Sequence, residues 1–153
     1  MYINPSETTV RPMRDEDVPE CQRILRACFV PPVAESYCLA IAMKDGKVTD
    51  YVVAEYMGLV VGLMLFELRQ DEVYGACLAV CPHFQGGGVG RLMAEWLIAK
   101  LPEFGSPSLT LHVHENDQIP QRLYKSLGFK HVATIPNVYP DGGAALAMRL
   151  DVP

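Results

Sequence analysis

The hydrophobic pattern alternates between strand-like and helix-like stretches along the chain. Continuous or alternating apolar runs predict strands at 8–13, 50–57, 59–68, 74–82, 109–114, 131–135 and 144–150. Apolar residues at helical spacing predict helices that begin near Asp15 or Asp17, at Val33, at Val89 and at Ile119. The predicted order is therefore β-α-α-β-β-β-α-β-α-β-β, which indicates a mixed α/β sheet with helices on both faces.

Glycine and proline mark where these elements end. Met57-Gly58 is predicted to join two strands as a hairpin, and Pro31-Pro32 to end the first helix. Pro120 is tolerable only in the first turn of its helix, and Gly128 is expected to close that helix in the left-handed conformation. No repeat or linker-like stretch interrupts the pattern, so we expect a single domain over residues 1–153.

Composition narrows the class of protein. No apolar run approaches the roughly 20 residues of a membrane helix, and the N-terminus lacks the layout of a secretory signal. The five cysteines form an odd set without a Cys-x-x-Cys pair, which favours reduced thiols in a cytoplasmic protein. Thirteen basic and eighteen acidic residues give a net charge of −5, which argues against a nucleic-acid surface.

A glycine-rich segment between an apolar strand and an amphipathic helix carries the clearest chemical signal. It reads Gln85-Gly86-Gly87-Gly88-Val89-Gly90-Arg91. Amides unshielded by side chains at a helix N-terminus form a cradle for an anion such as a phosphate. A P-loop would need Lys after the last glycine, and a dinucleotide site would need glycine at Met93. A turn that only lets the helix pack closely on the sheet is the alternative reading.

The motif Gln-x-x-Gly-x-Gly at 85–90 resembles the pyrophosphate-binding signature of the GCN5-related N-acetyltransferases, the GNAT superfamily. A second segment, 117–129, resembles the family's Asn-x-x-Ala-x-x-hydrophobic-Tyr-x-x-x-Gly-Phe pattern. Here Asp117 stands at the usual Asn position and Pro120 at the usual Ala, while Asn116 lies one residue early. An Asp cannot supply the amide donor. The resemblance spans nearly the whole chain and implies the GNAT fold, a mostly antiparallel sheet of about seven strands with about four helices.

The resemblance also implies a cosubstrate and an activity. In this family acetyl-CoA lies between two splayed central strands. The backbone of Leu78, Ala79 and Val80 would bind the pantetheine arm, the amides of 85–91 would wrap the pyrophosphate, and Asn116 or Asp117 would contact the cofactor arm. The implied reaction is direct acetyl transfer to a primary amine, either a small-molecule amine or a peptide N-terminus. The alternative is a non-catalytic acyl-CoA-binding module. A homodimer is also common in the family.

Acetyl transfer needs a base for the amine and a proton for the departing thiolate. Tyr124 matches the family's tyrosine that donates to the sulfur; its alternative role is packing on Phe129. His112 matches the base position of N-terminal acetyltransferases in the superfamily, and Tyr74 matches a second catalytic tyrosine of those relatives. An ordinary histidine pKa near 6.5 suits a base at neutral pH. Weaker candidate bases are His83, Glu72, Glu55 and Glu67.

Two open readings concern the histidines and the acceptor. His112 could be a hydrogen-bonded strand histidine without chemistry. His112 and His114 share a strand face, but no further ligand set is apparent, so we expect no metal. An α-amine, with a pKa of about 8, is easier to deprotonate than a lysine of about 10.4, which slightly favours an α-amino acceptor. The loops 31–36 and 136–143 are expected to set acceptor specificity.

Overall fold

The computed structural model describes residues 4–43 and 49–152. Its helices and strands follow the predicted order, with short 3-10 turns at Pro5–Glu7, Asp15–Asp17 and Pro82–Phe84. The strands are β1 (Thr8–Pro12), β2 (Thr49–Tyr56), β3 (Leu59–Leu68), β4 (Val73–Val80), β5 (Ser108–His114), β6 (Lys130–Ile135) and β7 (Ala145–Asp151). The α-helices are α1 (Val18–Cys28), α2 (Pro31–Met43), α3 (Val89–Lys100) and α4 (Gln118–Ser126).

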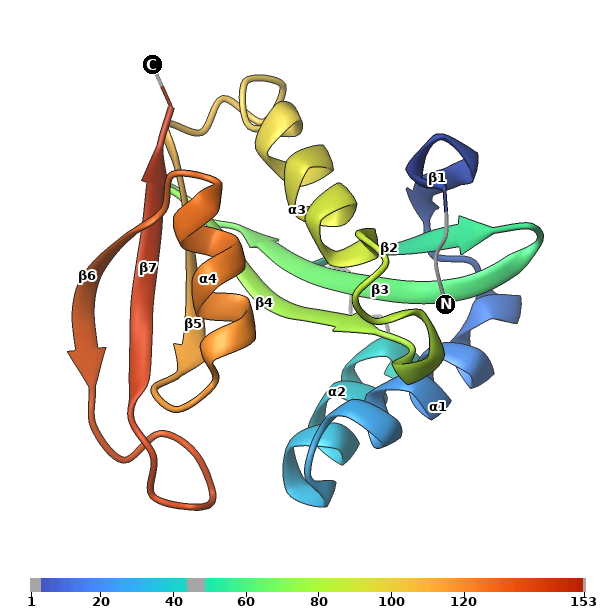
Figure 1. Ribbon diagram of the computed structural model, residues 1–153, viewed down its shortest axis with the longest axis horizontal. Helices are drawn as coiled ribbons and strands as arrows, with labels where there is room; N and C mark the ends of the chain where they lie inside the picture. Colours follow the sequence, from blue (N-terminus) through green and yellow to red (C-terminus); the bar gives the residue numbers. More distant parts are fainter. Residues whose placement is uncertain (1–3, 44–48, 153) are drawn as a thin grey trace.

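The seven strands form one sheet in the order β1-β2-β3-β4-β5-β7-β6. All neighbouring pairs are antiparallel except β4 and β5, which are parallel. The parallel pair extends over only three positions, from Val73↔Leu109 to Gly75↔Leu111. Beyond these paired positions the two strands diverge, as Figure 1 shows. The fold predicted from the sequence is confirmed, and its central strands splay.

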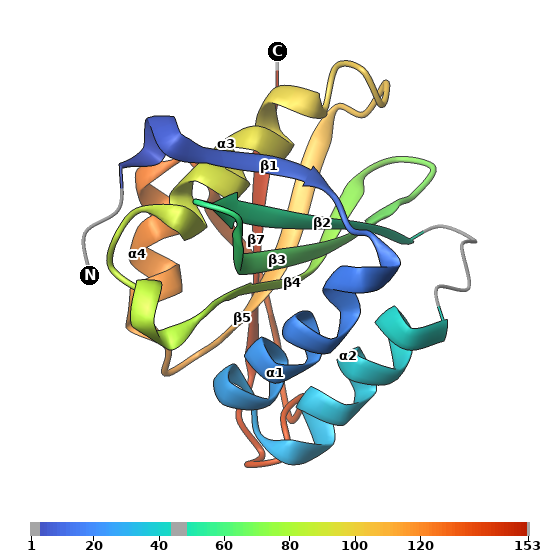
Figure 2. The same cartoon turned by 90° about the vertical axis from the view of Figure 1, so that its right-hand side faces the viewer.

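Two hydrophobic cores lie on opposite faces of the sheet because successive strand residues point to opposite sides. On β3, Leu63 and Leu65 pack with the buried face of α1 and α2, while Met64 and Phe66 pack with α3. Figures 1 and 2 show α1 and α2 together on one side of the sheet and α3 and α4 on the other. No helix in the described residues is long and apolar enough to cross a membrane.

The turns predicted at Gly58 and Gly128 are confirmed. Met57 and Gly58 both have positive φ, +50° and +79°, and connect β2 to β3. Gly128, with φ +100°, ends α4, and the Phe129 N–H donates to the Tyr124 carbonyl at 3.0 Å. A left-handed glycine after the last helical turn redirects the chain without steric cost.

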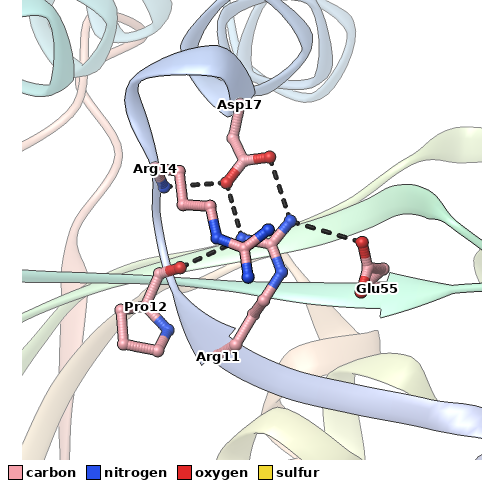
Figure 3. Close-up of polar contacts among 5 residues, drawn as sticks. All are labelled: Arg11, Pro12, Arg14, Asp17 and Glu55. Carbon is pink, nitrogen blue, oxygen red and sulfur yellow. Dashed lines mark hydrogen bonds and ion pairs between the residues drawn. The ribbon is translucent and has the colours of Figure 1, made fainter.

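Two details at the start of helices differ from the prediction. Helix α2 begins at Pro31 rather than Val33, because proline is well suited to the first helical position, where no amide donor is needed. Asp17 precedes α1 but makes no side-chain cap bond to it. Its carboxylate instead accepts the Arg14 N–H at 2.8 Å and pairs with the Arg11 guanidinium at 2.7 Å (Figure 3).

Candidate active site

A cleft of about 580 Å³ opens where β4 and β5 diverge. Its walls come from β4, β5, the start of α4, the end of α1 with the first turns of α2, and the loop before β7. The polar side chains on these walls include Tyr37, His112, His114, Tyr124, Tyr139 and Asp141. The cleft therefore joins elements from the first, middle and last parts of the chain.

The edge of β4 that faces the cleft carries backbone groups that β3 does not engage. The Cys81 N–H donates to Val61 at 2.8 Å, and Ala79 pairs with Leu63 in register. Because hydrogen-bonded and non-hydrogen-bonded pairs alternate in an antiparallel ladder, Ala79 turns its peptide groups toward β3. Leu78 and Val80 then turn theirs away from β3, toward the gap. Of the three residues predicted to bind the pantetheine arm, these two have the matching backbone orientation.

A β-bulge at Ala76 marks the start of this free edge. The register shifts so that Leu65 faces Cys77 while Phe66 faces Gly75. The Tyr37 hydroxyl, from α2, donates to the Ala76 carbonyl at 2.9 Å. A bulge leaves one residue out of the ladder and bends the strand. Tyr37 thus satisfies the carbonyl that the bulge releases, and it holds α2 against β4.

The glycine loop has the conformation of an anion cradle. Gly86 and Gly88 have φ of +80° and +92°, and α3 begins at Val89. The first amides of a helix have no intrahelical acceptor, so those at the start of α3 are available to a ligand. Close packing does not require Gly86 or Gly90. A Cβ would meet nothing within 4 Å at Gly86 and only ordinary contacts of 3.8 Å at Gly90.

Close packing between α3 and the sheet does involve a glycine, Gly62 on β3. A Cβ there would lie 2.8 Å from Met93 Cε and 3.1 Å from the Ala79 carbonyl oxygen. Helix α3 therefore packs on the sheet through Gly62, outside the predicted motif. The Gln85 side chain ties the start of the glycine loop to the end of β4, since its Nε2 donates to the Val80 carbonyl at 3.0 Å.

Tyr124 lies on α4 and is 6% exposed, with its ring 5.4 Å from that of Phe129. The two roles predicted for Tyr124, proton donor and packing residue, are therefore compatible, because it packs on Phe129 and also lines the cleft. Its hydroxyl makes no hydrogen bond with another described residue. Burial raises the pKa of Tyr124 well above its ordinary value, so the hydroxyl keeps its proton at neutral pH.

Tyr74 and His112 contact each other across β4 and β5. The Tyr74 hydroxyl lies 3.2 Å from His112 Nδ1, and the rings meet edge to face with centroids 5.1 Å apart. Burial, and then the charge of Arg69, lower the pKa of His112 below its ordinary value. Burial raises the pKa of Tyr74. At neutral pH the pair is therefore an uncharged imidazole beside a protonated phenol.

Charged residues at the end of β3 and in the turn to β4 lie beside this pair. The Arg69 guanidinium lies 4.2 Å from the centre of the Tyr74 ring and pairs with Glu67 at 2.9 Å. It also approaches Glu72 at 3.7 Å, and Glu72 accepts the Thr110 hydroxyl at 2.6 Å. The two carboxylates thus hold Arg69 in place over the face of Tyr74.

Comparison with known proteins agrees with this geometry. The model of the "Acetyltransferase (GNAT) family" matches residues 15–129, which include the glycine loop and the Tyr124 segment. The chain belongs to the GNAT family.

Curated and solved relatives of this GNAT protein are N-acetyltransferases. A ribosomal protein bS18-alanine N-acetyltransferase of Haemophilus ducreyi is 32% identical over 107 residues, which cover 65% of this chain and 74% of the relative. The N-alpha-acetyltransferase daf-31 of Caenorhabditis elegans is 27% identical over 150 residues, 94% of this chain and 82% of the relative. The crystal structure of the Escherichia coli ribosomal-protein-S18-alanine N-acetyltransferase superposes with a TM-score of 0.83 at 26% identity, covering 95% of this chain and 94% of that one. The GNAT protein described here is accordingly an N-acetyltransferase.

Of the other residues predicted to bind the cosubstrate of the GNAT enzyme, some line the cleft and others lie on the surface. Asp117 lines it at the start of α4, whereas Asn116 is exposed and uses its N–H to donate to His114 Nδ1 at 3.0 Å. Arg91 is on the surface of α3 and hydrogen-bonds Ser126 on α4. The contact of Asp117 with the cosubstrate stays a prediction.

The weaker candidate bases do not line the cleft. Glu55 pairs with Arg11 at 3.4 Å, and Glu67 pairs with Arg69. His83 is exposed in the turn before the glycine loop, and Glu72 is engaged by Thr110. His112 is the candidate base that reaches the cleft. In the part of the chain that the structure describes, no three His, Cys, Asp or Glu side chains form a metal-binding group.

Sequence reasoning missed Tyr37 and Cys28, both of which line the cleft. Tyr37 lies within the apolar pattern of α2, where nothing in its spacing separates it from a core residue. Cys28, at the end of α1, donates to the Val80 carbonyl at 3.2 Å. Its role depends on the bend of β4, which no local pattern reveals.

Proposed function

We propose that this enzyme transfers the acetyl group of acetyl-CoA to the α-amine of a peptide or protein N-terminus. The observation that carries the proposal is that His112, whose ring contacts Tyr74, and the buried Tyr124 line one cleft from different elements. The activities named for the relatives, on ribosomal protein alanine and on N-α-amines, support a peptide acceptor. A cytoplasmic location and a homodimer stay predictions.

The described residues fit acetyl-CoA, which supplies the acetyl group as a thioester when it is bound. Leu78 offers its N–H and carbonyl, and Val80 its N–H, along the gap between β4 and β5, as an added strand would need. The Val80 carbonyl is bound by Gln85 and Cys28. The amides at the start of α3 offer donors for the pyrophosphate, and Gly88 gives the left-handed turn that presents them. The same cleft continues past His112 to the α1–α2 connection, which leaves room for the acceptor.

His112 acts as the base in this proposal. With its proton on Nδ1 it donates to the Tyr74 oxygen, and the Nε2 lone pair is then free to accept a proton from the acceptor ammonium. Its lowered pKa keeps it uncharged but makes it a weak base. Deprotonating a lysine rather than an α-amine would cost about 3 kcal/mol more, which favours the α-amine.

Tyr124 acts as the acid. The new bond forms between the amine nitrogen and the acetyl carbon, and the carbon–sulfur bond breaks. His112 passes the proton of the ammonium to solvent before the neutral amine attacks, and it then takes the second amine proton as the amide forms. The Tyr124 hydroxyl gives its proton to the thiolate that leaves and regains one from solvent. Its raised pKa keeps the hydroxyl protonated until the thiolate forms, and burial strengthens the hydrogen bond that it donates.

Thiol release from acetyl-CoA tests the proposal. Acceptors would be a peptide that begins with alanine, the same peptide with a formylated N-terminus and an internal lysine, and a polyamine. We expect release with the free alanine peptide and little with the others. A preference for lysine or the polyamine would contradict the proposal. Saturable CoA binding, measured as a melting shift, without release for any amine would favour the non-catalytic module.

A further inference from the structure

The loop between β6 and β7 is fastened to the end of β5 by His114. His114 Nε2 and Asp141 Oδ2 are 2.8 Å apart, and the Tyr139 ring lies against the imidazole with centroids 4.8 Å apart. Within the loop, Val138 and Tyr139 donate to the Gly143 carbonyl at 3.0 and 3.2 Å. The loop is thus a preformed turn, and His114 fixes where that turn sits.

The protonation pattern of His114 is set by its neighbours. The Asn116 N–H donates to Nδ1 at 3.0 Å, so Nδ1 must carry the lone pair. Nε2 then carries the hydrogen and donates it to Asp141. The other oxygen of Asp141 accepts the Gly143 N–H at 2.8 Å. Both ring nitrogens are therefore engaged, and neither is free to act as a base or a metal ligand.

Gly143 makes the close approach possible. A Cβ at this position would collide with His114 Nε2 and lie 2.8 Å from Asp141 Oδ1. Gly142, with φ +82°, bends the chain just before it. The loop base is held separately, because the Ala144 N–H donates to the Glu115 carboxylate at 2.6 Å. Loss of the His114 contact would therefore free the tip of the loop without releasing its base.

The tip of this loop forms one wall of the cleft. Tyr139, Pro140 and Asp141 line it, as do Phe29, Val30, Pro32 and Val33 at the α1–α2 connection. In Figures 1 and 2 the loop and this connection lie at the same end of the molecule, away from the glycine loop. If acetyl-CoA lies along β4 and α3, as proposed above, this end of the cleft receives the acceptor.

We propose that His114 is a positioning residue for the acceptor: it holds the loop so that Tyr139 and the Asp141 carboxylate form the wall that the incoming amine meets. This inference rests on the proposed function for the identity of the acceptor. The carboxylate gives that wall a negative charge, which suits a cationic ammonium. His114 takes part in neither proton transfer nor cofactor binding.

Two amide substitutions of equal chemistry but different length test the inference. In His114→Gln the side-chain amide reaches the position of Nε2 and still donates to Asp141. In His114→Asn the shorter amide can accept from Asn116 but cannot reach Asp141. With an alanine-starting peptide as acceptor, we expect His114→Asn to raise the KM for the peptide about tenfold. The KM for acetyl-CoA should not change, and His114→Gln should stay within about threefold of the natural protein.

Hydrogen exchange of the Tyr139, Gly142 and Gly143 amides gives a readout that does not depend on turnover. It should be faster in His114→Asn than in His114→Gln, at an unchanged melting temperature. Faster exchange with an unchanged peptide KM would overturn the inference, and so would equal exchange in both variants. If the natural protein acetylates no peptide, the proposed function fails, while the exchange rates still decide whether His114 holds the loop.

Discussion

The Tyr74 hydroxyl and His112 Nδ1 lie 3.2 Å apart at the point where β4 and β5 stop pairing and diverge. Tyr74 lies within the three-residue stretch over which the two strands pair. His112 is the first residue of β5 beyond that stretch. A base at this junction is fixed by the paired strands on one side and faces the open cleft on the other. The geometry explains how a side chain can be both rigid and accessible.

His112→Ala should lower kcat for an α-amino peptide about a hundredfold or more, because general-base catalysis contributes about 10²–10⁴. Tyr74→Phe removes only the hydroxyl and keeps the ring contacts with Arg69 and His112, so we expect about a tenfold loss. Steady-state kinetics at several pH values would measure both. Full activity of His112→Ala on a good peptide would show that another group, or the solvent, accepts the proton.

Tyr124→Phe should lower kcat by about 10² or more while leaving the KM for acetyl-CoA nearly unchanged, since only the proton donor is lost. The phenyl ring keeps the packing on Phe129, and the missing hydroxyl leaves no described partner unpaired. The melting temperature should therefore stay the same. A large drop in melting temperature together with normal kcat would assign Tyr124 a packing role alone.

Much of this arrangement could be predicted from the sequence because its signals are local. The glycine loop and the Gly128-Phe129 ending carry conformational requirements within a few residues, and alternating apolar residues identify the strands. The starting point of α2 was wrong by two residues, because Pro31-Pro32 is compatible both with ending one helix and with beginning the next.

The residues that the sequence did not reveal are placed by long-range geometry. Tyr37 matters because a bulge frees the carbonyl of Ala76, 39 residues away. The contact of His114 with Asp141 spans 27 residues and depends on the path of a loop that has no periodic pattern. Such contacts arise when distant elements pack together, and no window of the sequence contains both partners.

Removing the positive charge of Arg69 and removing the negative charge of Glu72 should shift the pH profile of kcat/KM in opposite directions. His112 must be uncharged to act as a base, so the acid limb of the profile should lie below its ordinary pKa of about 6.5. Arg69→Gln removes a nearby positive charge and should shift that limb to higher pH. Glu72→Gln removes a negative charge and should shift it to lower pH.

Arg23→Gln, on the exposed face of α1, serves as the control and should leave the profile in place. Shifts of Arg69→Gln and Glu72→Gln in the same direction would show that the limb does not report His112. Direct titration of the His112 ring by NMR would then separate its pKa from that of the acceptor amine.

Gly88 and Gly90 should respond differently to alanine. Gly88 has φ +92°, where an L-residue costs about 1–2 kcal/mol, so Gly88→Ala should lower stability and raise the KM for acetyl-CoA. Gly90 is in the first turn of α3, and a Cβ there makes ordinary contacts of 3.8 Å with Leu123 and Val80. Gly90→Ala keeps its amide and should be neutral. Equal effects of both substitutions on acetyl-CoA would contradict a cradle formed by the conformation of Gly88.

Asp17→Asn should destabilise the protein by about 3 kcal/mol, because it leaves the Arg11 charge buried without its main partner. Both side chains are largely buried, 7% and 12% exposed, and Asp17 also accepts the Arg14 N–H (Figure 3). The pKa of Asp17 is lowered by these contacts. Its contribution is therefore present above the unfolded pKa of about 3.9 and is lost as the pH falls through the lower folded value.

Urea unfolding between pH 7 and pH 3 measures the effect of this ion pair. The difference in free energy of unfolding between the natural protein and Asp17→Asn should be largest at pH 7 and should shrink at the acid end, once the natural carboxyl is protonated too. Asp151→Asn removes the carboxylate of the exposed pair Arg149–Asp151, which has a similar distance of 2.9 Å. That control should cost less than about 1 kcal/mol, because solvent screens an exposed pair. Equal losses for the two substitutions would mean that burial does not strengthen the Arg11–Asp17 contact.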